Sequence, residues 1–233
     1  MEKILFVAIA FLVQLSIIYS QADQANPPIL QGPYLGQTPP GAVADIFAPG
    51  FVSTGLEESV ITFMPDGREC YWSILLSGFE TILTSRLEND KWSEPQVAPF
   101  AGKYYDGWPA VQPDGKRMFF HSSRPRPTGN PGITAKYNIW YMDRTGNGWS
   151  ELINLGKEIN SIMCAGASSF SADGKHFFFQ ARVPTKNTLA LERKNSLKEL
   201  LDNEIRNPAK GSADIYWIDA EIIEALKPGR TSK

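Results

Sequence analysis

The chain has 233 residues, of which 42% are hydrophobic and 12% aromatic, so it can bury one substantial core but not several large domains. Its formal net charge is −2, with acidic and basic residues interspersed, which excludes the strongly basic surface typical of nucleic-acid binding. The 19 glycines and 17 prolines, together with many aromatic residues, predict short strands joined by turns rather than long helices.

The N-terminus has the features of a secretory signal. Lys3 precedes an apolar run over Ile4–Ile18, and small residues follow at Ser20 and Ala22. We therefore expect residues 1–22 to be a cleaved signal peptide and the protein to be exported, with a periplasmic, cell-surface or secreted location. The run is short for a membrane span, although an uncleaved anchor is the alternative. No membrane span is expected after signal cleavage.

Residues 23–42 are rich in proline, glycine and glutamine and predict an extended lead-in. Residues 43–227 contain an internal repeat, and residues 228–233 form a tail. Each repeat has an apolar strand, an Asp-Gly turn with a basic residue after it, and a second, aromatic strand; the three copies are 60–73, 108–122 and 167–180. Asp-Gly supplies the positive φ angles of a tight hairpin. The consecutive apolar residues after each turn predict a second strand buried on both faces.

Further repeated elements predict a larger unit. A third strand is expected at 81–84, 138–141 and 214–217, and an outer fourth strand at 91–95 and 148–152. Four antiparallel strands in roughly 40–50 residues is the size of a propeller blade. The short segment 45–48 could complete the last sheet. Aligned on the turns, one position that looks solvent-facing is occupied by Glu69, Arg117 and His176.

Two helices are expected to interrupt the pattern. Ser196 and Glu199 form a capping-box signature, and the apolar residues that follow predict an amphipathic insertion over 196–206. Near the end of the chain, Asp219 can cap a short helix, which would replace the outer strand of the last repeat. Its inward residues are expected to be Ile222, Ile223 and Leu226.

The turn segments resemble the PD40, or WD40-like, propeller repeats of TolB-like exported proteins. The residues that carry the resemblance are Met64 to Arg68, Gln112 to Lys116, Ser171 to Lys175, and Ser122 to Arg124. The resemblance implies an all-β, propeller-like array of about three blades in an exported binding module. It carries over no catalytic residue. Propellers usually close with four to eight blades, so we expect a shortened member. Such an open array would have to pair with another copy through exposed blade edges, close tightly or be only marginally stable.

Ligand-binding candidates gather at one end of the second hairpin. Trp108 and Asp106 follow Tyr104 and Tyr105, an arrangement that could stack a sugar ring or hold a peptide, with core packing as the alternative. His121 ends the second strand. Arg124 and Arg126, in a proline-rich loop, could bind an anion or simply be solvated.

The preferred hypothesis is a non-enzymatic module that binds a protein, peptide or glycan. The alternatives are a glycan-acting hydrolase that uses inner-strand carboxylates such as Asp106, or a degenerate propeller fragment. The repeated turn aspartates Asp66, Asp114 and Asp173 are interpreted as structural. The two histidines and two cysteines do not form a zinc pattern, so no metal or cofactor is expected. Cys70 and Cys164 are either a disulfide or two buried thiols.

Overall fold

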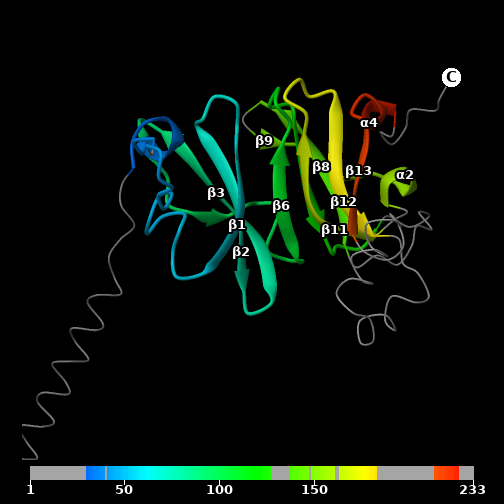
Figure 1. Cartoon of the computed structure of the whole chain (residues 1–233), viewed down its shortest axis with the longest axis horizontal. Coiled ribbons are helices and arrows are strands. Elements are labelled where there is room, and N and C mark those ends of the chain that lie inside the picture. The colour runs from blue at the N-terminus through cyan, green and yellow to red at the C-terminus, as the bar shows by residue number, and fades with distance from the viewer. Residues whose placement is uncertain are drawn as a thin grey trace, which may run out of the picture.

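The computed structural model describes residues 30–39, 41–126, 137–146, 148–160, 163–182 and 213–225. The regular structure of the described residues is mostly antiparallel strands, which form three sheets that follow one another along the molecule (Figure 1). This confirms the predicted all-β class. The predicted signal peptide and the predicted helix at 196–206 lie outside the described residues.

Sheet 1 contains five strands: β1 (Glu57–Phe63), β2 (Glu69–Leu76), β3 (Phe79–Glu88), β4 (Lys91–Trp92) and β5 (Gln96–Val97). Sheet 2 contains β6 (Asp106–Val111), β7 (Arg117–Ser122), β8 (Asn138–Thr145), β9 (Gly148–Trp149) and β10 (Ile153–Asn154). Sheet 3 contains β11 (Met163–Phe170), β12 (His176–Arg182) and β13 (Ala213–Asp219). The expectation of four strands per unit is therefore wrong in detail, because the first two sheets have five strands and the described part of the third has three.

The remaining elements are short. They are the 3-10 helix η1 (Pro33–Gly36) and the helices α2 (Lys157–Asn160) and α4 (Ile222–Ala225). Among the described residues, no helix is long and apolar enough to cross a membrane.

The three predicted hairpins are confirmed, and their turns have the same local geometry. In each one the aspartate side chain accepts a hydrogen bond from the backbone N–H two residues later, at 3.0 Å for Asp66, 2.9 Å for Asp114 and 3.1 Å for Asp173. The glycine that follows has a φ near 70°, which a residue with a side chain rarely adopts. The fold therefore repeats because a local chemical feature repeats.

Successive turns also contact one another. A Cβ atom on Gly67 would lie 2.9 Å from the ring of Tyr34, and one on Gly115 would lie 3.0 Å from Pro65. A Cβ atom on Gly174 would lie 3.8 Å from Pro113. Each turn thus rests on the element that precedes it in the chain.

In each sheet the pairing between the first and second strands is interrupted by a bulge at a similar position. The pairing register shifts between Ser59 and Ile61 in β1, between Gly107 and Ala110 in β6, and between Cys164 and Ser168 in β11. At the first two of these bulges, Val60 and Trp108 have positive φ angles of 35° and 52°. A bulge bends its strand and turns side chains away from regular alternation.

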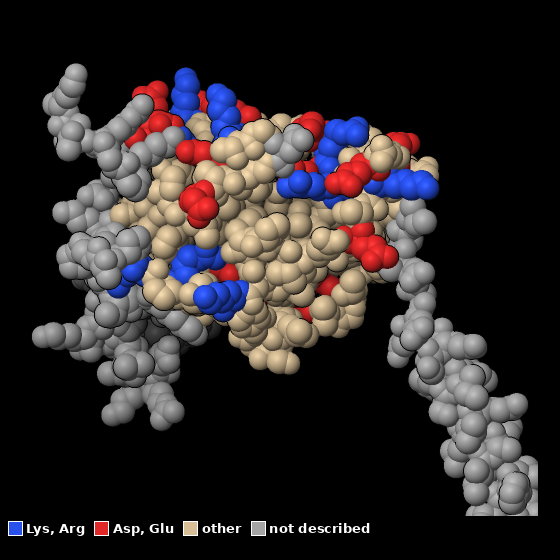
Figure 2. All heavy atoms as spheres, turned by 180° about the vertical axis from the view of Figure 1, so that it is seen from behind, with Lys and Arg blue, Asp and Glu red and all other residues tan. Residues whose placement is uncertain are grey.

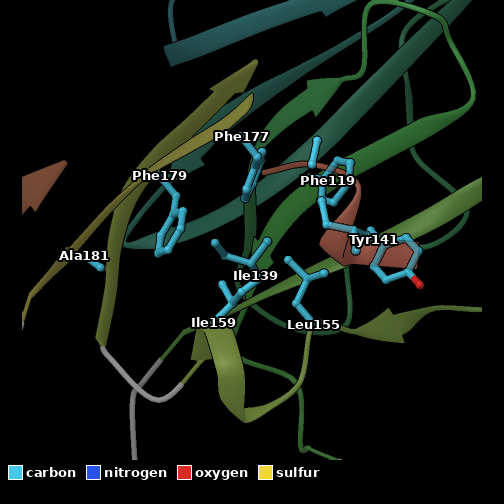
Figure 3. Close-up of a cluster of buried hydrophobic side chains, with 10 residues drawn as sticks. Phe119, Ile139, Tyr141, Leu155, Ile159, Phe177, Phe179 and Ala181 are labelled. Carbon is cyan, nitrogen blue, oxygen red and sulfur yellow. The ribbon is translucent and has the colours of Figure 1, made fainter. Parts of the chain in front are cut away.

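Three apolar cores separate the layers. The first lies between residues 30–53 and sheet 1, and it includes Leu35, Phe51 and Trp72. The second joins sheets 1 and 2 and includes Ile82, Phe120 and Trp140. The third joins sheets 2 and 3, and Figure 3 shows side chains from β7, β8 and β12 converging there with Leu155 and Ile159.

Burial of the second strands follows from these layers. Every residue of β7, and all but the last two of β2, is buried, as predicted. In β12 only alternate residues, such as Phe177 and Phe179, are fully buried, so the prediction of burial on both faces is wrong for this strand. The described structure covers β12 on one side only.

Several expectations for the N-terminal region need correction. Residues 45–48 do not complete the last sheet, because Phe47 and Ala48 pack on sheet 1 at the opposite end of the molecule. Part of the expected lead-in is also packed there: η1 lies within it, and Leu35 is 1% exposed. The segment is rich in proline and glycine, yet it serves as a cover for an apolar sheet face.

The charged position after the turn was expected to face solvent, and this expectation is wrong for sheets 1 and 2. Glu69 and Arg117 are buried, and only His176 keeps partial exposure. Glu69 forms ion pairs with Arg86 at 2.9 Å and Arg144 at 2.7 Å. Arg117 pairs with Asp143 at 2.8 Å and also with Glu224. These ion pairs with residues of other elements offset the free-energy cost of burying a charged side chain.

The C-terminal helix is described over Ile222–Ala225, and the predicted inward residue Leu226 lies outside the described residues. The Asp219 side chain accepts a hydrogen bond from the backbone N–H of Glu221 at 2.9 Å, which agrees with its predicted capping role. Ile223 is buried, but Ile222 is 49% exposed, so the prediction that both point inward is wrong. Adjacent residues of a helix point in different directions, and only one of this pair faces the core.

Candidate functional site

The sequence-predicted site residues meet between sheets 1 and 2. Asp106 begins β6 and Ser122 ends β7, and these two residues are paired neighbours in sheet 2. The Ser122 hydroxyl donates to Asp106 Oδ1 at 2.6 Å, and Arg124 Nη2 donates to the same oxygen at 2.7 Å. Arg124 Nε donates to Ser122 Oγ at 2.7 Å. The three side chains therefore form one closed, charge-assisted cluster.

This cluster is buried. Asp106 is 0% exposed, and Arg124 is 8% exposed, so the guanidinium is not in a solvated loop. Burial raises the pKa of Asp106, while the Ser122 hydrogen bond and the Arg124 charge act in the opposite direction. Asp106 thus holds Arg124 in place, and its carboxylate has no direct access to a substrate.

Arg124 is also enclosed by aromatic rings. Its guanidinium carbon lies 5.0 Å from the ring centroid of Phe120, 5.5 Å from that of Trp140 and 5.7 Å from that of Tyr104. Nη2 also donates to the Phe100 carbonyl at 2.9 Å. Arg124 therefore fixes the 100–104 segment, which follows sheet 1, against the face of sheet 2.

Trp108 and His121 form a second contact. Their rings meet edge to face, with centroids 5.3 Å apart. Trp108 lies in the β6 bulge, and its backbone N–H donates to Ser73 Oγ at 2.9 Å. This hydrogen bond links sheet 2 to sheet 1. His121 is fully buried, and desolvation lowers its pKa to about 3. Among the described residues, neither ring nitrogen of His121 has a hydrogen-bond partner.

Glu80 is a buried acid that the sequence interpretation missed. It is 3% exposed and accepts hydrogen bonds from Tyr105, Ser73 and Ser59. Burial raises its pKa. A Cβ on Gly107 would lie within 2.6 Å of the Glu80 carboxylate oxygens, so glycine is required there for close approach. Glu80 follows a tight turn and has no neighbouring motif, so no local signal predicts its burial.

A cavity of about 670 Å³ opens beside the Arg124 cluster, between the 99–104 segment of sheet 1 and strands β8 and β9 of sheet 2. This volume is in the range of small-ligand pockets. Four rings line it, from Tyr71, Phe100, Tyr104 and Trp149. Three cations line it as well, from Arg86, Lys103 and Arg124, against one carboxylate from Glu151.

The back wall of the cavity is held by an internal network. Trp149 Nε1 donates to the Tyr71 hydroxyl at 2.7 Å, and that hydroxyl donates to Glu69. The Arg86 and Arg144 ion pairs complete the surroundings of Glu69. Burial, followed by the nearby Glu69 charge, raises the pKa of Tyr71 to about 12. The wall is therefore rigid, and most of its polar groups are already used.

The predicted candidates divide into two groups relative to this cavity. Arg124 lines it, whereas Asp106 supports Arg124 from behind and His121 is enclosed in the sheet. Trp108 is half-buried and is not among the lining residues. The sequence interpretation missed Lys103, Arg86 and Trp149 as cavity residues. The Trp92–Trp149 repeat was the available signal.

A smaller cavity of about 290 Å³ lies between the turns of sheets 2 and 3, lined by Asp114, Lys116, Asp173 and Lys175 among others. In Figure 2, charged side chains gather along the upper edge, where Figure 1 places the β11–β12 turn. The acidic and basic side chains that line this smaller cavity balance one another. Within the described ranges, no group of three or more histidine, cysteine, aspartate or glutamate side chains is arranged to hold a metal ion.

Cys70 is a free, buried thiol on β2. Burial raises its pKa to about 12, so it remains protonated and unreactive at neutral pH. Because Cys70 is free, the structure has no Cys70–Cys164 disulfide, and the alternative of a buried thiol holds for Cys70. The Cys164 side chain lies outside the described part of the structure.

Comparison with known proteins gives distant likenesses. No protein-family model matches the chain, and no curated protein sequence matches it. Among solved structures it is similar to TolB from Acinetobacter baumannii, with a TM-score of 0.41 and 19% identity over 72% of this chain and 31% of TolB. It is also similar to a prolyl endopeptidase, with a TM-score of 0.35 and 15% identity over 54% of this chain and 18% of the other.

A third likeness is to Kuenenia stuttgartiensis hydrazine synthase, with a TM-score of 0.34 and 13% identity over 68% of this chain and 49% of the other. The chain spans about a third of the length of TolB. At these scores the likenesses carry no conclusion about ligand or activity, and the functional argument depends on the geometry of the chain itself.

Proposed function

We propose that this protein is an exported, propeller-like, non-enzymatic binding module whose ligand site is the cavity between sheets 1 and 2. The observation that carries the proposal is the cavity lining, in which four aromatic rings and the exposed Lys103 surround about 670 Å³, while the Arg86 and Arg124 charges are paired with Glu69 and Asp106. Rings provide apolar contact area at low entropic cost, and cations select an acidic partner. The site lies on two adjacent sheets whose contact is fixed by the Arg124 cluster.

The lining favours a peptide over a glycan. Sugar recognition needs many free hydrogen-bonding groups, but the Tyr71 hydroxyl, Trp149 Nε1 and the Arg124 guanidinium are engaged inside the protein. The cavity is left with apolar walls and an exposed ammonium group at Lys103. This suits a segment of a protein partner that presents one large apolar side chain beside an acidic residue.

The hydrolase alternative has less support. Its candidate acid, Asp106, is fully buried and accepts hydrogen bonds from Ser122 and Arg124. Replacing Asp106 with alanine would leave the Arg124 charge unpaired and destabilise the fold by about 3–5 kcal/mol. Loss of activity in that variant would not distinguish a catalytic acid from a structural one. Three well-packed cores also speak against the degenerate-fragment alternative.

A peptide array tests the proposal. The probes are short synthetic peptides with a single tryptophan, phenylalanine or leucine, flanked by glutamates in one set and by lysines in the other. We expect the glutamate set to bind the protein and the lysine set not to bind. Lys103→Glu should weaken binding about tenfold or more, equivalent to ~1.4 kcal/mol, because it reverses a charge at the cavity mouth.

Lys91→Glu is the matched control, since Lys91 is an equally exposed lysine of sheet 1 that does not line the cavity. It should leave binding unchanged. Equal binding of the two peptide sets, or equal losses in the two variants, would contradict the proposed site.

A further inference from the structure

The free face of sheet 3 has the same positions as the face of sheet 1 that packs on sheet 2 and the face of sheet 2 that packs on sheet 3. Counted from the Asp-Gly turns, Tyr71, Phe119 and Phe178 occupy the same position on the second strand. Opposite them on the third strand lie Thr84, Tyr141 and Trp217. In the next row on the same face, the third-strand residues are Ile82, Ile139 and Ile215.

The equivalent positions differ sharply in exposure. Ile82 and Ile139 are 0% exposed, because the next sheet covers each of them, whereas Ile215 is 68% exposed. Trp217 is 62% exposed. Ile215 and Trp217 are two large apolar side chains exposed on one sheet face, and grouped exposed apolar residues mark interaction sites. In this fold, the element that covers such a face is another sheet of the same kind.

The aromatic side chains on the free face of sheet 3 already pack against one another. Phe178 and Trp217 stack with centroids 6.2 Å apart and an interplanar angle of 11°. His176 lies against the other part of the Trp217 ring, with centroids 5.2 Å apart. Rings held in this way lose little conformational freedom when a partner covers them.

The edge beside this face is free as well. In sheet 1 the third strand, β3, pairs with β5, and in sheet 2 the third strand, β8, pairs with β10. In the described part of sheet 3, β13 is the last strand and only β12 pairs with it. An open face and an open strand edge therefore meet at Ile215 and Trp217.

We propose that this surface, formed by Phe178, Ile215 and Trp217, binds a second copy of the chain in a two-fold dimer. The other end of the array is closed by residues 30–53, so a second copy cannot add to sheet 1. Within the described residues, Ile215 and Trp217 are the most exposed large apolar side chains of the three sheets. A two-fold axis lets one such surface satisfy the same surface of its partner. The dimer would align two sets of three sheets.

The test uses the chain without its predicted signal segment, residues 23–233, in sedimentation velocity from nanomolar to high micromolar concentration. The wild type should convert from monomer to dimer. Trp217→Glu and Ile215→Lys should each weaken dimerisation about a hundredfold or more, because each places a charge in the apolar contact. Ile215 protrudes from the surface, so its variant does not threaten the fold.

The matched control is Val43→Glu, Ile46→Glu, which changes two similarly exposed apolar residues, 80% and 63% exposed, at the other end of the molecule. This variant should dimerise like the wild type. Hydrogen exchange should show the β13 amides protected only at concentrations that give dimer. A wild type that stays monomeric would overturn the proposal. So would a dimer that Trp217→Glu leaves intact, or β13 protection in the monomer, which would indicate cover by the chain itself.

Discussion

The two ends of the sheet array differ in one respect: the first has a cover and the last does not. Residues 30–53 cover the outer face of sheet 1, whereas the described structure leaves the equivalent side of sheet 3 exposed (Figure 1). The cover also reproduces contacts that one sheet makes with the next. Trp92 Nε1 donates to the Gly32 carbonyl at 2.6 Å, and its repeat equivalent Trp149 donates to Tyr71 of sheet 1 at 2.7 Å.

This difference shows that the repeated unit is not self-sufficient. A sheet with two apolar faces needs a neighbour on each side. At one end a non-repetitive segment takes the place of a preceding sheet, and at the other end the position of a following sheet is open. The contrast can be tested by removing equivalent side chains at covered and uncovered positions.

The largest effect is expected at the three equivalent isoleucines. Ile82→Ala and Ile139→Ala should each lower the free energy of unfolding by about 2–5 kcal/mol, because each leaves a cavity in a sheet-to-sheet core. Ile215→Ala should change it by less than about 0.5 kcal/mol in dilute protein, because its side chain is already in solvent. Urea denaturation of the three variants measures this, and equal losses would mean that sheet 3 is covered in solution.

An intermediate effect is expected for acidification, which should lower the stability of the fold through the buried His121. Burial lowers the pKa of His121 to about 3, below its ordinary value of 6.5. The stability contributed by neutral His121 is therefore complete above pH 6.5 and is lost as the pH falls towards 3, at ~1.4 kcal/mol per pH unit. His121→Leu should flatten the dependence of thermal stability on pH over this window. A slope that stays unchanged in this variant would exclude His121 as its source.

The smallest effect is expected where the cover is fastened by a single hydrogen bond. Trp92→Phe keeps most of the ring packing but removes the N–H that donates to Gly32. The free energy of unfolding should fall by about 0.5–1.5 kcal/mol. Hydrogen exchange should increase in residues 30–36 more than in sheet 3. A uniform increase would mean that the cover and the far sheet unfold together.

The sequence predicted the parts of the fold that local chemistry determines. Asp66, Asp114 and Asp173 each precede a glycine and a basic residue, and this local pattern was enough to place three hairpins. The cover was not predictable in this way, because its Pro- and Gly-rich residues carry no periodic pattern. It also packs against strands such as β3 that are distant in sequence. Proline-rich composition indicates a linker only when no apolar face is nearby to bind it.

The position of the candidate residues follows from the same local pattern, and their role in ligand binding stays a prediction. Asp106, His121, Trp108 and Arg124 lie at the end of one hairpin, because strand pairing brings its two ends together. Their burial could not be foreseen, because it depends on Phe100 and Tyr104 from the preceding sheet. Lys103 and Arg86 carry no motif and become cavity residues only when sheets 1 and 2 meet.

The turn-to-turn contacts also decide which turn glycines could accept a side chain. A Cβ atom would lie 2.9 Å from its nearest neighbour at Gly67, 3.0 Å at Gly115 and 3.8 Å at Gly174. Alanine would therefore crowd the preceding element at the first two turns, whereas at Gly174 the positive φ of 70° is the remaining obstacle.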